Sequence, residues 1–496
     1  MKKLFFTLFT MILIFSSCEK KTKTTIINET NYEGYTELTI LDNMNFGRHG
    51  FPDFGYMVSK EEYFQKYSHE PVFKIKTDFP TVKPKKMPEF ITKIDFKKEP
   101  KKYIEAVRQY GLEGNRNNWN PYLNKIRDWY HIPWLHPSSD GYSATDGNEG
   151  PPFGGTEGFH GLIKEAPVSA LQLSPKQNGA NYGVYAVTLI NDMAGYAMGR
   201  MWKDPNNPNY KVLDKRYSDG GFPEGTVFIK LLFTDAPKIG LGDEIDYLVN
   251  PMTWNAYITN TFMNEIPKGK TEAPKRSVNE VHLLQMDISV RDPRANRSPS
   301  NPEGTGWVFG TFCYNGKLNK KDKFMNLVPV GLMWGNDPED RTNMTTAFPY
   351  TKTTVNKNLK ETVIFESDDL PPQHLGWNGR LDGPADLTTS SCISCHNSAG
   401  FPQHAKLMMS DAPKYNGSKT PPPGGGSDEW MQYYQNIECG ESIDQETQYS
   451  TDFSFQVAIS LQNYFFASPS VRRGLWASDY LIERVSFGRA GSTPSE

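Results

Sequence analysis

The middle of the chain alternates between runs of apolar, β-branched residues and short polar clusters rich in Gly, Pro, Asn and Asp. This pattern is typical of successive β-strands separated by turns. No helical pattern stands out between the runs, which favours antiparallel pairing. The sequence therefore predicts an α+β protein whose core is an antiparallel sheet. We expect its strands at Tyr182–Ile190, Thr226–Phe233, Val281–Val290, Gly306–Tyr314 and Leu327–Trp334.

Helical patterns lie on either side of these strands. Pro100 suits the first position of a helix that ends near Tyr110, before Gly111. Asp452 is the expected N-cap of a second helix, Phe453–Ala467, whose continuous apolar character requires burial. Shorter helices are expected at 59–67, 403–410 and 478–484. The helices thus belong to an N-terminal extension and to a C-terminal group around the sheet.

The first residues have the organisation of an export signal. Met1-Lys2-Lys3 precedes an apolar run, Leu4–Phe15, that is too short to span a bilayer. Ser16-Ser17-Cys18 resembles the lipobox of bacterial lipoproteins, which implies cleavage before Cys18 and acylation of that cysteine. The alternative is an ordinary secretory signal followed by an unmodified cysteine. Both interpretations predict export, with a signal peptide at 1–17 and a polar tether at 18–45.

One short motif carries specific chemistry. Cys392-Ile393-Ser394-Cys395-His396 has the C-x-x-C-H spacing of a c-type haem attachment site. In this interpretation Cys392 and Cys395 form thioethers with one covalent haem c, and His396 is the proximal ligand of the iron. The alternatives are half of a zinc site and a redox-active dithiol. A structural zinc site needs four ligands, and the chain has no second C-x-x-C pair. A thioredoxin-like dithiol belongs to a βαβ context, which the strand pattern does not predict.

The cysteine count agrees with an oxidising compartment. The chain has five cysteines, of which lipidation would use Cys18 and haem attachment would use the pair in the motif. Cys313 and Cys439 remain. They form either a disulfide, which an exported protein can make, or two separate buried thiols. The sequence alone leaves both possibilities open.

Composition narrows the class of protein further. With 496 residues, including 29 Phe, 25 Tyr and 10 Trp, the chain can bury a large core. The formal net charge of -3 gives no indication of nucleic-acid binding. Gly and Pro are frequent, at 41 and 36 residues, so we expect many loops. After the N-terminal signal no apolar run is long enough for a membrane helix, so membrane contact is expected through the lipid anchor only.

Phrases in the strand region resemble a known family. Gly221-Phe-Pro-Glu-Gly-Thr-Val-Phe-Ile-Lys230 is similar to the opening of the central strands of cytochrome P460 and cytochrome c′-beta. Asp287-Ile-Ser-Val-Arg-Asp292 and Gly306-Trp-Val-Phe309 are similar to the next two strands of that family, and the C-x-x-C-H motif follows in the family's order. The likeness covers about 182–314 and the motif. The chain departs from the family by its long N-terminal part and by an insertion at 315–390.

The resemblance implies that the antiparallel sheet packs on the haem. In the family a lysine on the first of these strands is bound to the porphyrin edge, and by position this lysine is Lys230. An acid on the next strand accepts protons, and by position this acid is Asp287. Judged from the residues alone, Lys230 could instead face solvent, and Asp287 could be a surface or ion-paired residue. Lys230 and Asp287 are therefore the candidate catalytic residues, and Lys230 is also a candidate for cofactor binding.

The identity of a sixth iron ligand stays open. Methionine and histidine side chains commonly fill this position in cytochromes. The candidates in this chain are His131, His136, His160, Met408, Met409 and Met431.

These patterns divide the chain into successive segments. After the signal peptide and the tether, 46–180 form an N-terminal extension with aromatic, His-rich and Gly-rich loops. Residues 181–410 form the haem domain, including the insertion. Residues 411–428 contain a Pro- and Gly-rich stretch and form a linker, and 429–496 form the C-terminal helices on the core.

Three functions are consistent with these features. The first is P460-like oxidation of a small nitrogen compound, such as hydroxylamine or NO, at a five-coordinate haem, with Asp287 as proton acceptor. The second is an electron-transfer cytochrome with a six-coordinate haem and a protein redox partner in the cell envelope. The third is a module that binds a diatomic gas without turnover. All three predict a lipid-anchored protein of the periplasm or the outer membrane, without a nucleic-acid partner.

Overall fold

The computed structural model describes most of the chain between Val58 and Ala467. The described residues are 58, 60–73, 76, 78–115, 119–133, 156–165, 167–177, 182–204, 207–236, 245–258, 276–342, 350–403 and 426–467. The predicted signal peptide, Cys18, the tether, nearly all of the helix predicted at 403–410 and the helix predicted at 478–484 lie outside these residues.

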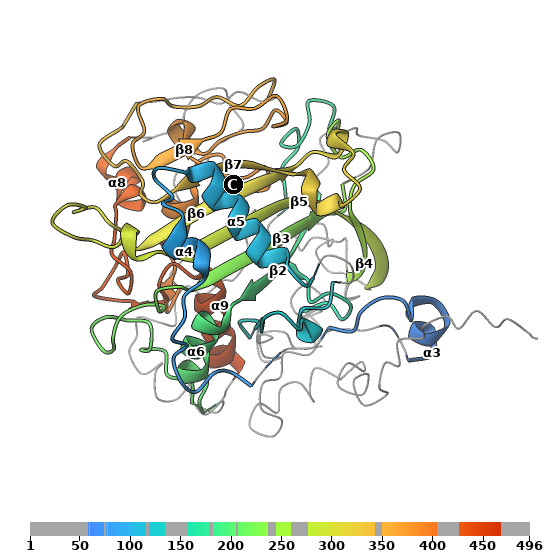
Figure 1. Ribbon diagram of the computed structural model, residues 1–496, viewed down its shortest axis with the longest axis horizontal. Helices are drawn as coiled ribbons and strands as arrows, with labels where there is room; N and C mark the ends of the chain where they lie inside the picture. The colour runs from blue at the N-terminus through green and yellow to red at the C-terminus, as the bar shows by residue number, and fades with distance from the viewer. Residues whose placement is uncertain are drawn as a thin grey trace, which may run out of the picture.

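An antiparallel sheet of eight strands organises the fold (Figure 1). Its order is β1-β2-β3-β5-β6-β7-β8, and β4 pairs with β5 beside this row. Every pair of neighbouring strands is antiparallel. The prediction of an α+β protein with an antiparallel sheet is therefore confirmed. The strands are β1 (Ile163–Lys164), β2 (Val184–Ile190), β3 (Val227–Thr234), β4 (Thr253–Ile258), β5 (Ser277–Arg291), β6 (Trp307–Tyr314), β7 (Leu327–Met333) and β8 (Thr362–Ile364).

The five predicted strands correspond to β2, β3, β5, β6 and β7, with ends that differ by a few residues. One helix, α6 (Asp192–Met201), lies between β2 and β3, where the sequence pattern predicts none. Its Gly195 weakens the helical pattern, but a Cβ at this position would lie 2.8 Å from the Tyr130 ring. The side chain of Asn191 caps the helix by accepting a hydrogen bond from Ala194 N. Close packing against Tyr130 therefore explains why position 195 is a glycine, and this glycine made the helix hard to predict from the sequence.

Most other helices are short. Besides α6, the α-helices are α3 (Lys60–Glu62), α4 (Glu89–Lys93), α5 (Pro100–Leu112), α7 (Cys392–His396), α8 (Asp428–Met431) and α9 (Phe455–Ala467). A π-helical turn, η1 (Tyr63–Tyr67), continues α3. The 3-10 turns are η2 (Pro121–Leu123), η6 (Pro293–Ala295), η7 (Gly316–Leu318), η8 (Lys323–Asn326), η9 (Trp377–Gly379) and η12 (Gln432–Tyr434). A second, two-stranded sheet pairs β9 (Gly400–Phe401) with β10 (Tyr449–Ser450).

Helix α5 covers one face of the large sheet (Figure 1). It continues past Gly111, the predicted stop, to Leu112. A Cβ at Gly111 would lie 2.8 Å from Ile229 Cγ2 on β3. A Cβ at Gly310 on β6 would lie 3.1 Å from Ile104 Cδ1 on α5. Gly111 therefore permits a close approach of helix and sheet and does not end the helix.

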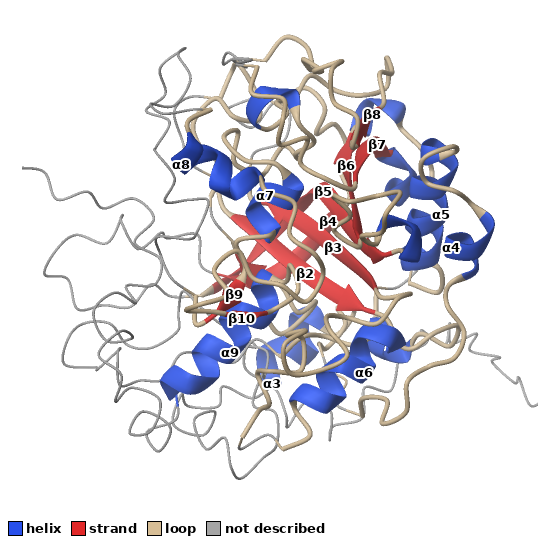
Figure 2. Cartoon of the chain, turned by 90° about the vertical axis from the view of Figure 1, so that its left-hand side faces the viewer, coloured by secondary structure: helices blue, strands red, loops and turns tan. Residues whose placement is uncertain are grey.

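Helices α7 and α9 lie on the other side of the sheet from α5 (Figure 2). The ring centroids of Phe309 on β6 and His396 on α7 are 5.0 Å apart. Tyr103 of α5, most buried apolar residues of the sheet and Leu461 of α9 belong to one hydrophobic core. The described parts of the N-terminal extension and of the C-terminal region thus pack on the sheet.

Helix α9 begins at Phe455, later than predicted. Ser454 caps it, because Ser454 Oγ accepts a hydrogen bond from Val457 N at 3.3 Å. Asp452 is not the cap. Asp452 and Phe453 have φ values of +48° and +64°, which lie in the left-handed region and cannot continue into a right-handed helix.

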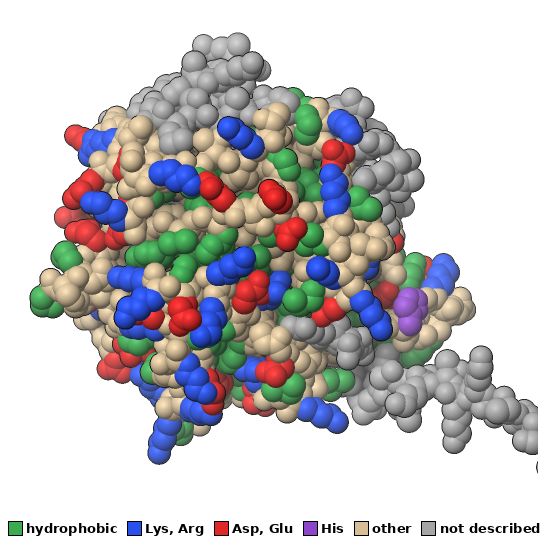
Figure 3. Space-filling view, turned by 45° about the horizontal axis from the view of Figure 1, so that its top comes forward, with side chains coloured by type: hydrophobic (Ala, Val, Ile, Leu, Met, Phe, Trp, Pro, Cys, Tyr) green, Lys and Arg blue, Asp and Glu red, His purple; other side chains and the backbone are tan. Residues whose placement is uncertain are grey.

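The described surface carries charges of both signs. On the face seen in Figure 3, lysine and arginine side chains are interspersed with aspartate and glutamate. Several exposed lysines have acidic neighbours; Lys86 and Lys93, for example, both pair with Glu89. Exposed pairs of this kind contribute little to stability, because water and salt screen them. No helix in the described part of the chain has the length and apolar character that crossing a bilayer would need.

Candidate functional site

A polar row crosses the centre of the sheet on the face opposite α5. Lys230 on β3 pairs directly with Asp287 on β5. The row continues to Thr188 on β2 and to Thr311 on β6. Directly paired residues share a face of the sheet, whereas Ile229, next to Lys230, projects the other way and packs on α5. The structure thus places the two candidate catalytic residues side by side.

The C-x-x-C-H motif forms helix α7 on the same side of the sheet as this row. Phe309 projects from β6 to the face of the polar row, and its ring contacts His396. Burial has the largest effect on the pKa of both the Cys392 thiol and His396. In addition, the negative charge of Asp287 raises the pKa of Cys392, and the positive charge of Lys230 lowers the pKa of His396. The structure therefore brings together the residues predicted for catalysis and cofactor binding, which are Lys230, Asp287, Cys392, Cys395 and His396.

Hydrogen bonds at its first turn hold α7 in place. The side chains and backbone N–H groups of Ser391 and Ser394 form a reciprocal capping box. The Ser391 hydroxyl also donates to Asn336 Oδ1 at 2.8 Å, which ties the helix to the segment after β7. Cys392 and Cys395 are three residues apart in this helix, so both thiols lie on the same side of it.

His396 is held as a neutral imidazole in one tautomer. Its Nδ1 lies 2.7 Å from the carbonyl oxygen of Phe453, which can only accept, so Nδ1 carries the proton. Burial lowers the pKa of His396, the hydrogen bond to Phe453 opposes this change, and the charge of Lys230 lowers the pKa further. A neutral imidazole with a protonated Nδ1 offers the lone pair of Nε2 to a metal, as ligation of haem iron requires.

The two thiols of α7 are free and are not activated. Burial raises the pKa of Cys395 to about 12, and the carboxylate of Asp382 raises it as well. Burial raises the pKa of Cys392 well above its usual range, with a further contribution from Asp382. A redox-active dithiol needs a lowered thiol pKa, so the raised pKa values of Cys392 and Cys395 argue against such a dithiol. Among the residues that the structure describes, no group of three or more His, Cys, Asp or Glu is arranged to hold a metal ion.

Lys230 is a charged residue that faces carboxylates. Its Nζ lies 2.9 Å from Glu165 Oε1, directly after β1. Burial alone would lower the pKa of Lys230, but the negative charges of Glu165 and Asp287 outweigh burial, and the pKa is raised. A protonated ammonium group is not a nucleophile. In this arrangement Lys230 acts as a cation beside Asp287.

Asp287 is held by neutral donors and has a raised pKa. Thr311 Oγ1 donates to Asp287 Oδ1 at 2.6 Å, and Gln285 Nε2 lies 2.8 and 3.0 Å from the two carboxylate oxygens. Burial raises the pKa of Asp287 to about 7, and the charge of Asp386 also raises it. The hydrogen bond from Thr311 and the charge of Lys230 act in the opposite direction. A carboxyl group with this pKa can accept a proton at neutral pH, as a general base must.

Further acidic residues adjoin Asp287 that the sequence analysis missed. Gln285 Nε2 also lies 2.9 Å from Asp386 Oδ2, and Asp386 is hydrogen-bonded to Asp382. Burial raises the pKa of Asp382 well above its usual range, and the charge of Asp386 adds to this effect. Gln285 could have been found, because it lies two residues before Asp287 on the same face of one strand. Asp382 and Asp386 lie in a loop, where spacing carries no signal of this kind.

The residues of this face keep accessible surface at the centre of the sheet. On β3 and β5 the side chains that face α5 are at most 1% exposed; they are Val227, Ile229, Met286 and Ile288. On the other face, four side chains are only partly buried, namely Phe228, Lys230, Asp287 and Ser289, whereas Leu232 and Gln285 beside them are buried. The side chain of Lys230 retains 32% of its accessible surface. Both thiols of α7 and the His396 ring are also partly buried. The donor atoms and the partly exposed mixed surface therefore fit a haem held by Cys392, Cys395 and His396.

The candidates for a sixth ligand are only partly described. His160 stacks on Trp254 of β4 with ring centroids 4.2 Å apart, and His131 packs edge-on against Phe73. Burial lowers the pKa of each histidine to about 3. Met431 belongs to an aromatic cluster that packs against Cys395 in the motif helix. The other candidates lie outside the described residues; they are His136, Met408 and Met409.

The possible disulfide between Cys313 and Cys439 is not present, and both thiols are free. Cys313 lies near the end of β6. Cys439 precedes Gly440, whose N–H donates to Asp452 beside the indole of Trp307, at the other end of β6. The strand between Trp307 and Cys313 spans about 20 Å, whereas disulfide-bonded cysteines have Cα atoms roughly 4.4–6.8 Å apart. Of the two possibilities that the sequence leaves open, the structure therefore shows two separate thiols.

Comparisons of the chain with protein-family models, with curated proteins and with solved structures found no match. The resemblance to the P460 family therefore stays a prediction from the quoted phrases. In the structure these phrases lie on adjacent antiparallel strands: Gly221–Lys230 leads into β3, Asp287–Asp292 ends β5, and Gly306–Phe309 begins β6.

Proposed function

We propose that this protein is an exported, lipid-anchored c-type cytochrome of the cell envelope that oxidises a small nitrogen compound, such as hydroxylamine. Cys392 and Cys395 would hold one covalent haem, and His396 would be the axial ligand of its iron. When bound, the haem supplies a redox centre that receives electrons from the substrate. Asp287 takes up a proton from the substrate, and Lys230 balances the charge of the nearby carboxylates. A redox protein of the envelope is the expected electron acceptor.

The observation that carries this proposal is the place of Asp287 beside the C-x-x-C-H helix. An electron carrier and a gas-binding module both need iron ligands, but neither needs a proton acceptor. Asp287 has a pKa of about 7 and projects from the face of the sheet on which the motif helix α7 lies. A well-placed general base contributes roughly 10²–10⁴-fold to a rate. This combination favours oxidation of a compound that has an N–H or O–H group, such as hydroxylamine, over oxidation of NO, which has no proton to give.

The test uses the full chain, purified after co-expression with a haem-ligation system. We expect covalent haem, a high-spin five-coordinate iron in the resonance Raman spectrum, and turnover of hydroxylamine. Asp287→Asn should keep the haem and lose the turnover. A low-spin, six-coordinate iron would support electron transfer instead. A five-coordinate iron that binds NO but turns over no nitrogen compound would support the gas-binding alternative.

A covalent bond between Lys230 and the haem edge is a separate part of the family likeness. A proteolytic peptide that contains Lys230 and carries the mass of a haem would establish it. If Lys230→Ala leaves the absorption spectrum unchanged, the cross-link is excluded. In that case the role of Lys230 is limited to its charge, which is consistent with its ion pair with Glu165.

A further inference from the structure

A tight turn carries the carbonyl group that holds His396. Ser454 N donates to Thr451 O at 3.1 Å, so residues 451–454 form a β-turn. The two central residues, Asp452 and Phe453, have φ values of +48° and +64°. Two successive positive φ values are typical of a type I′ turn, which is usually occupied by Gly, Asn or Asp. A bulky residue such as Phe is strained in this region, so the surroundings must hold the turn.

The carboxylate of Asp452 binds three separate segments of the chain. Asp452 Oδ1 accepts hydrogen bonds from Trp307 Nε1 and from Gly440 N, each at 3.0 Å. Asp452 Oδ2 accepts a hydrogen bond from Phe222 N. Asp452 is fully buried, and the nearby guanidinium of Arg291 supplies an opposite charge. The side chain of Asp452 therefore links the start of β6 to the loops before β3 and β10.

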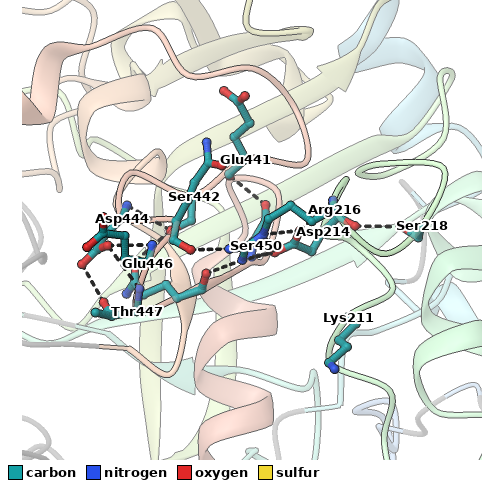
Figure 4. Close-up of polar contacts among 12 residues, drawn as sticks. Lys211, Asp214, Arg216, Ser218, Glu441, Ser442, Asp444, Glu446, Thr447 and Ser450 are labelled. Carbon is teal, nitrogen blue, oxygen red and sulfur yellow. Dashed lines mark hydrogen bonds and ion pairs between the residues drawn. The ribbon is translucent and has the colours of Figure 1, made fainter. Parts of the chain in front are cut away.

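The segment that enters the turn is anchored as well. Ser450 N donates to Asp214 Oδ2 at 3.0 Å, and Arg216 pairs with the same carboxylate (Figure 4). Ser450 Oγ in turn accepts a hydrogen bond from Asp452 N at 3.0 Å. On the other side of the turn, the Phe453 ring packs against Trp307 and Phe309, with centroids 6.4 and 6.2 Å away. These contacts restrict the direction of the Phe453 carbonyl.

We propose that Asp452 is a positioning residue for the axial histidine. By holding the turn 451–454 in its left-handed conformation, Asp452 directs the Phe453 carbonyl at His396 Nδ1. The strength of that hydrogen bond then sets how strongly His396 donates to iron, because a more polarised N–H makes the imidazole a better donor. This inference rests on the proposed function, since it requires His396 to be an iron ligand.

The test measures the bond between iron and His396 in the intact, haem-loaded protein. Asp452→Asn keeps the size of the side chain but removes the charge and one of the two acceptor oxygens. We expect this variant to retain covalent haem, with the iron–histidine stretching band in the resonance Raman spectrum of the reduced protein at lower frequency. Its reduction potential should be higher than that of the wild type. Trp307→Phe removes one hydrogen-bond donor to Asp452 and keeps an aromatic ring. It should shift the iron–histidine band and the reduction potential in the same directions but by less. It also serves as the test variant if Asp452→Asn does not fold.

The matched control is Asp292→Asn. Asp292 is also fully buried and hydrogen-bonded, but its partners are Tyr103 on α5 and Arg294. This variant should lose stability and leave the iron–histidine band unchanged. The proposal is overturned if Trp307→Phe and every folded Asp452 variant keep the wild-type band and potential, or if Asp292→Asn shifts them equally. A wild-type protein without covalent haem would contradict the proposed function instead, so the two failures can be told apart.

Discussion

The two faces of the sheet differ in what their side chains do, although alternate residues of the same strands form both. Toward α5, Ile229 and Met286 are almost completely buried, and Gly310 allows Ile104 to approach closely. Toward α7, Lys230, Asp287 and Thr311 form a polar row whose members keep partial exposure or bind one another. The first face provides the apolar burial that stabilises the fold. The second face carries the residues of the proposed site.

A polar row in the middle of a sheet is costly unless its groups are paired. Here Lys230 has Glu165 as an ion-pair partner, and Asp287 accepts hydrogen bonds from Thr311 and Gln285. The row is therefore compatible with a stable fold, but apolar side chains at the same positions would stabilise the fold more. The difference between the faces predicts that substitutions on one face change chemistry and those on the other change stability.

Asp287→Asn should give the largest functional effect. Asparagine keeps the shape of the side chain but cannot accept a proton from the substrate. We expect the rate of hydroxylamine oxidation to fall by roughly 10²–10⁴-fold, with haem content and unfolding midpoint nearly unchanged. Ser289→Ala is the matched control, because Ser289 lies two residues further along the same face of β5. Equal losses of activity in Asp287→Asn and Ser289→Ala would contradict the assignment of Asp287 as the proton acceptor.

Ile229→Ala should give the largest effect on stability. It leaves a cavity against Gly111 of α5, and we expect the free energy of unfolding in urea to fall by about 2–5 kcal/mol. Ile229→Val should lower it by roughly 0.5–1.5 kcal/mol. Both variants should keep the wild-type turnover per haem at temperatures where they stay folded. A large loss of turnover in folded Ile229→Val would show that the faces are not independent.

The pH dependence of turnover should report the charge around Asp287. The active form is deprotonated, so the rate should rise with pH through a midpoint near the Asp287 pKa of about 7 and level off above it. Asp386→Asn removes a negative charge that raises this pKa. We therefore expect the midpoint to move to lower pH, by on the order of one unit. A midpoint that stays in place or rises would contradict the assignment of the titration to Asp287.

Thr311→Val should give the smallest shift, and in the opposite direction. It removes a hydrogen bond that favours the charged form of Asp287, so the midpoint should rise by roughly half a unit. Thr188→Val is the control, because Thr188 lies at the other end of the row and pairs with Lys230. If both variants give the same profile, the hydrogen bond from Thr311 does not tune Asp287.

Much of the sheet could be predicted from the sequence, because buried strands leave a local pattern. The strand that became β6 is one example, since it differs from its prediction by one residue at its start. Helix α6 escaped prediction because Gly195 is set by a contact with Tyr130, far away in sequence. Gly111 led to the prediction that the helix ends too early. This glycine also reflects a close contact, with Ile229 on another element. Local patterns cannot reveal contacts that only the fold creates.

The candidate site divides in the same way. Cys392 and His396 could be found from spacing within one motif, and Lys230 and Asp287 from phrases on two strands. Asp386 could not be found, because its approach to Gln285 depends on the path of a loop that is about a hundred residues away in sequence. For the same reason, the sequence could not decide whether Cys313 and Cys439 form a disulfide. Two cysteines can be counted in a sequence, but their separation is a property of the fold.

The most direct test of this account is the intact mass and the pyridine haemochrome spectrum of the full chain, purified after co-expression with a haem-ligation system. The account predicts the added mass of one haem and a c-type spectrum, both lost in the double variant Cys392→Ser, Cys395→Ser. A folded, colourless wild-type protein of unmodified mass at these cysteines would contradict it.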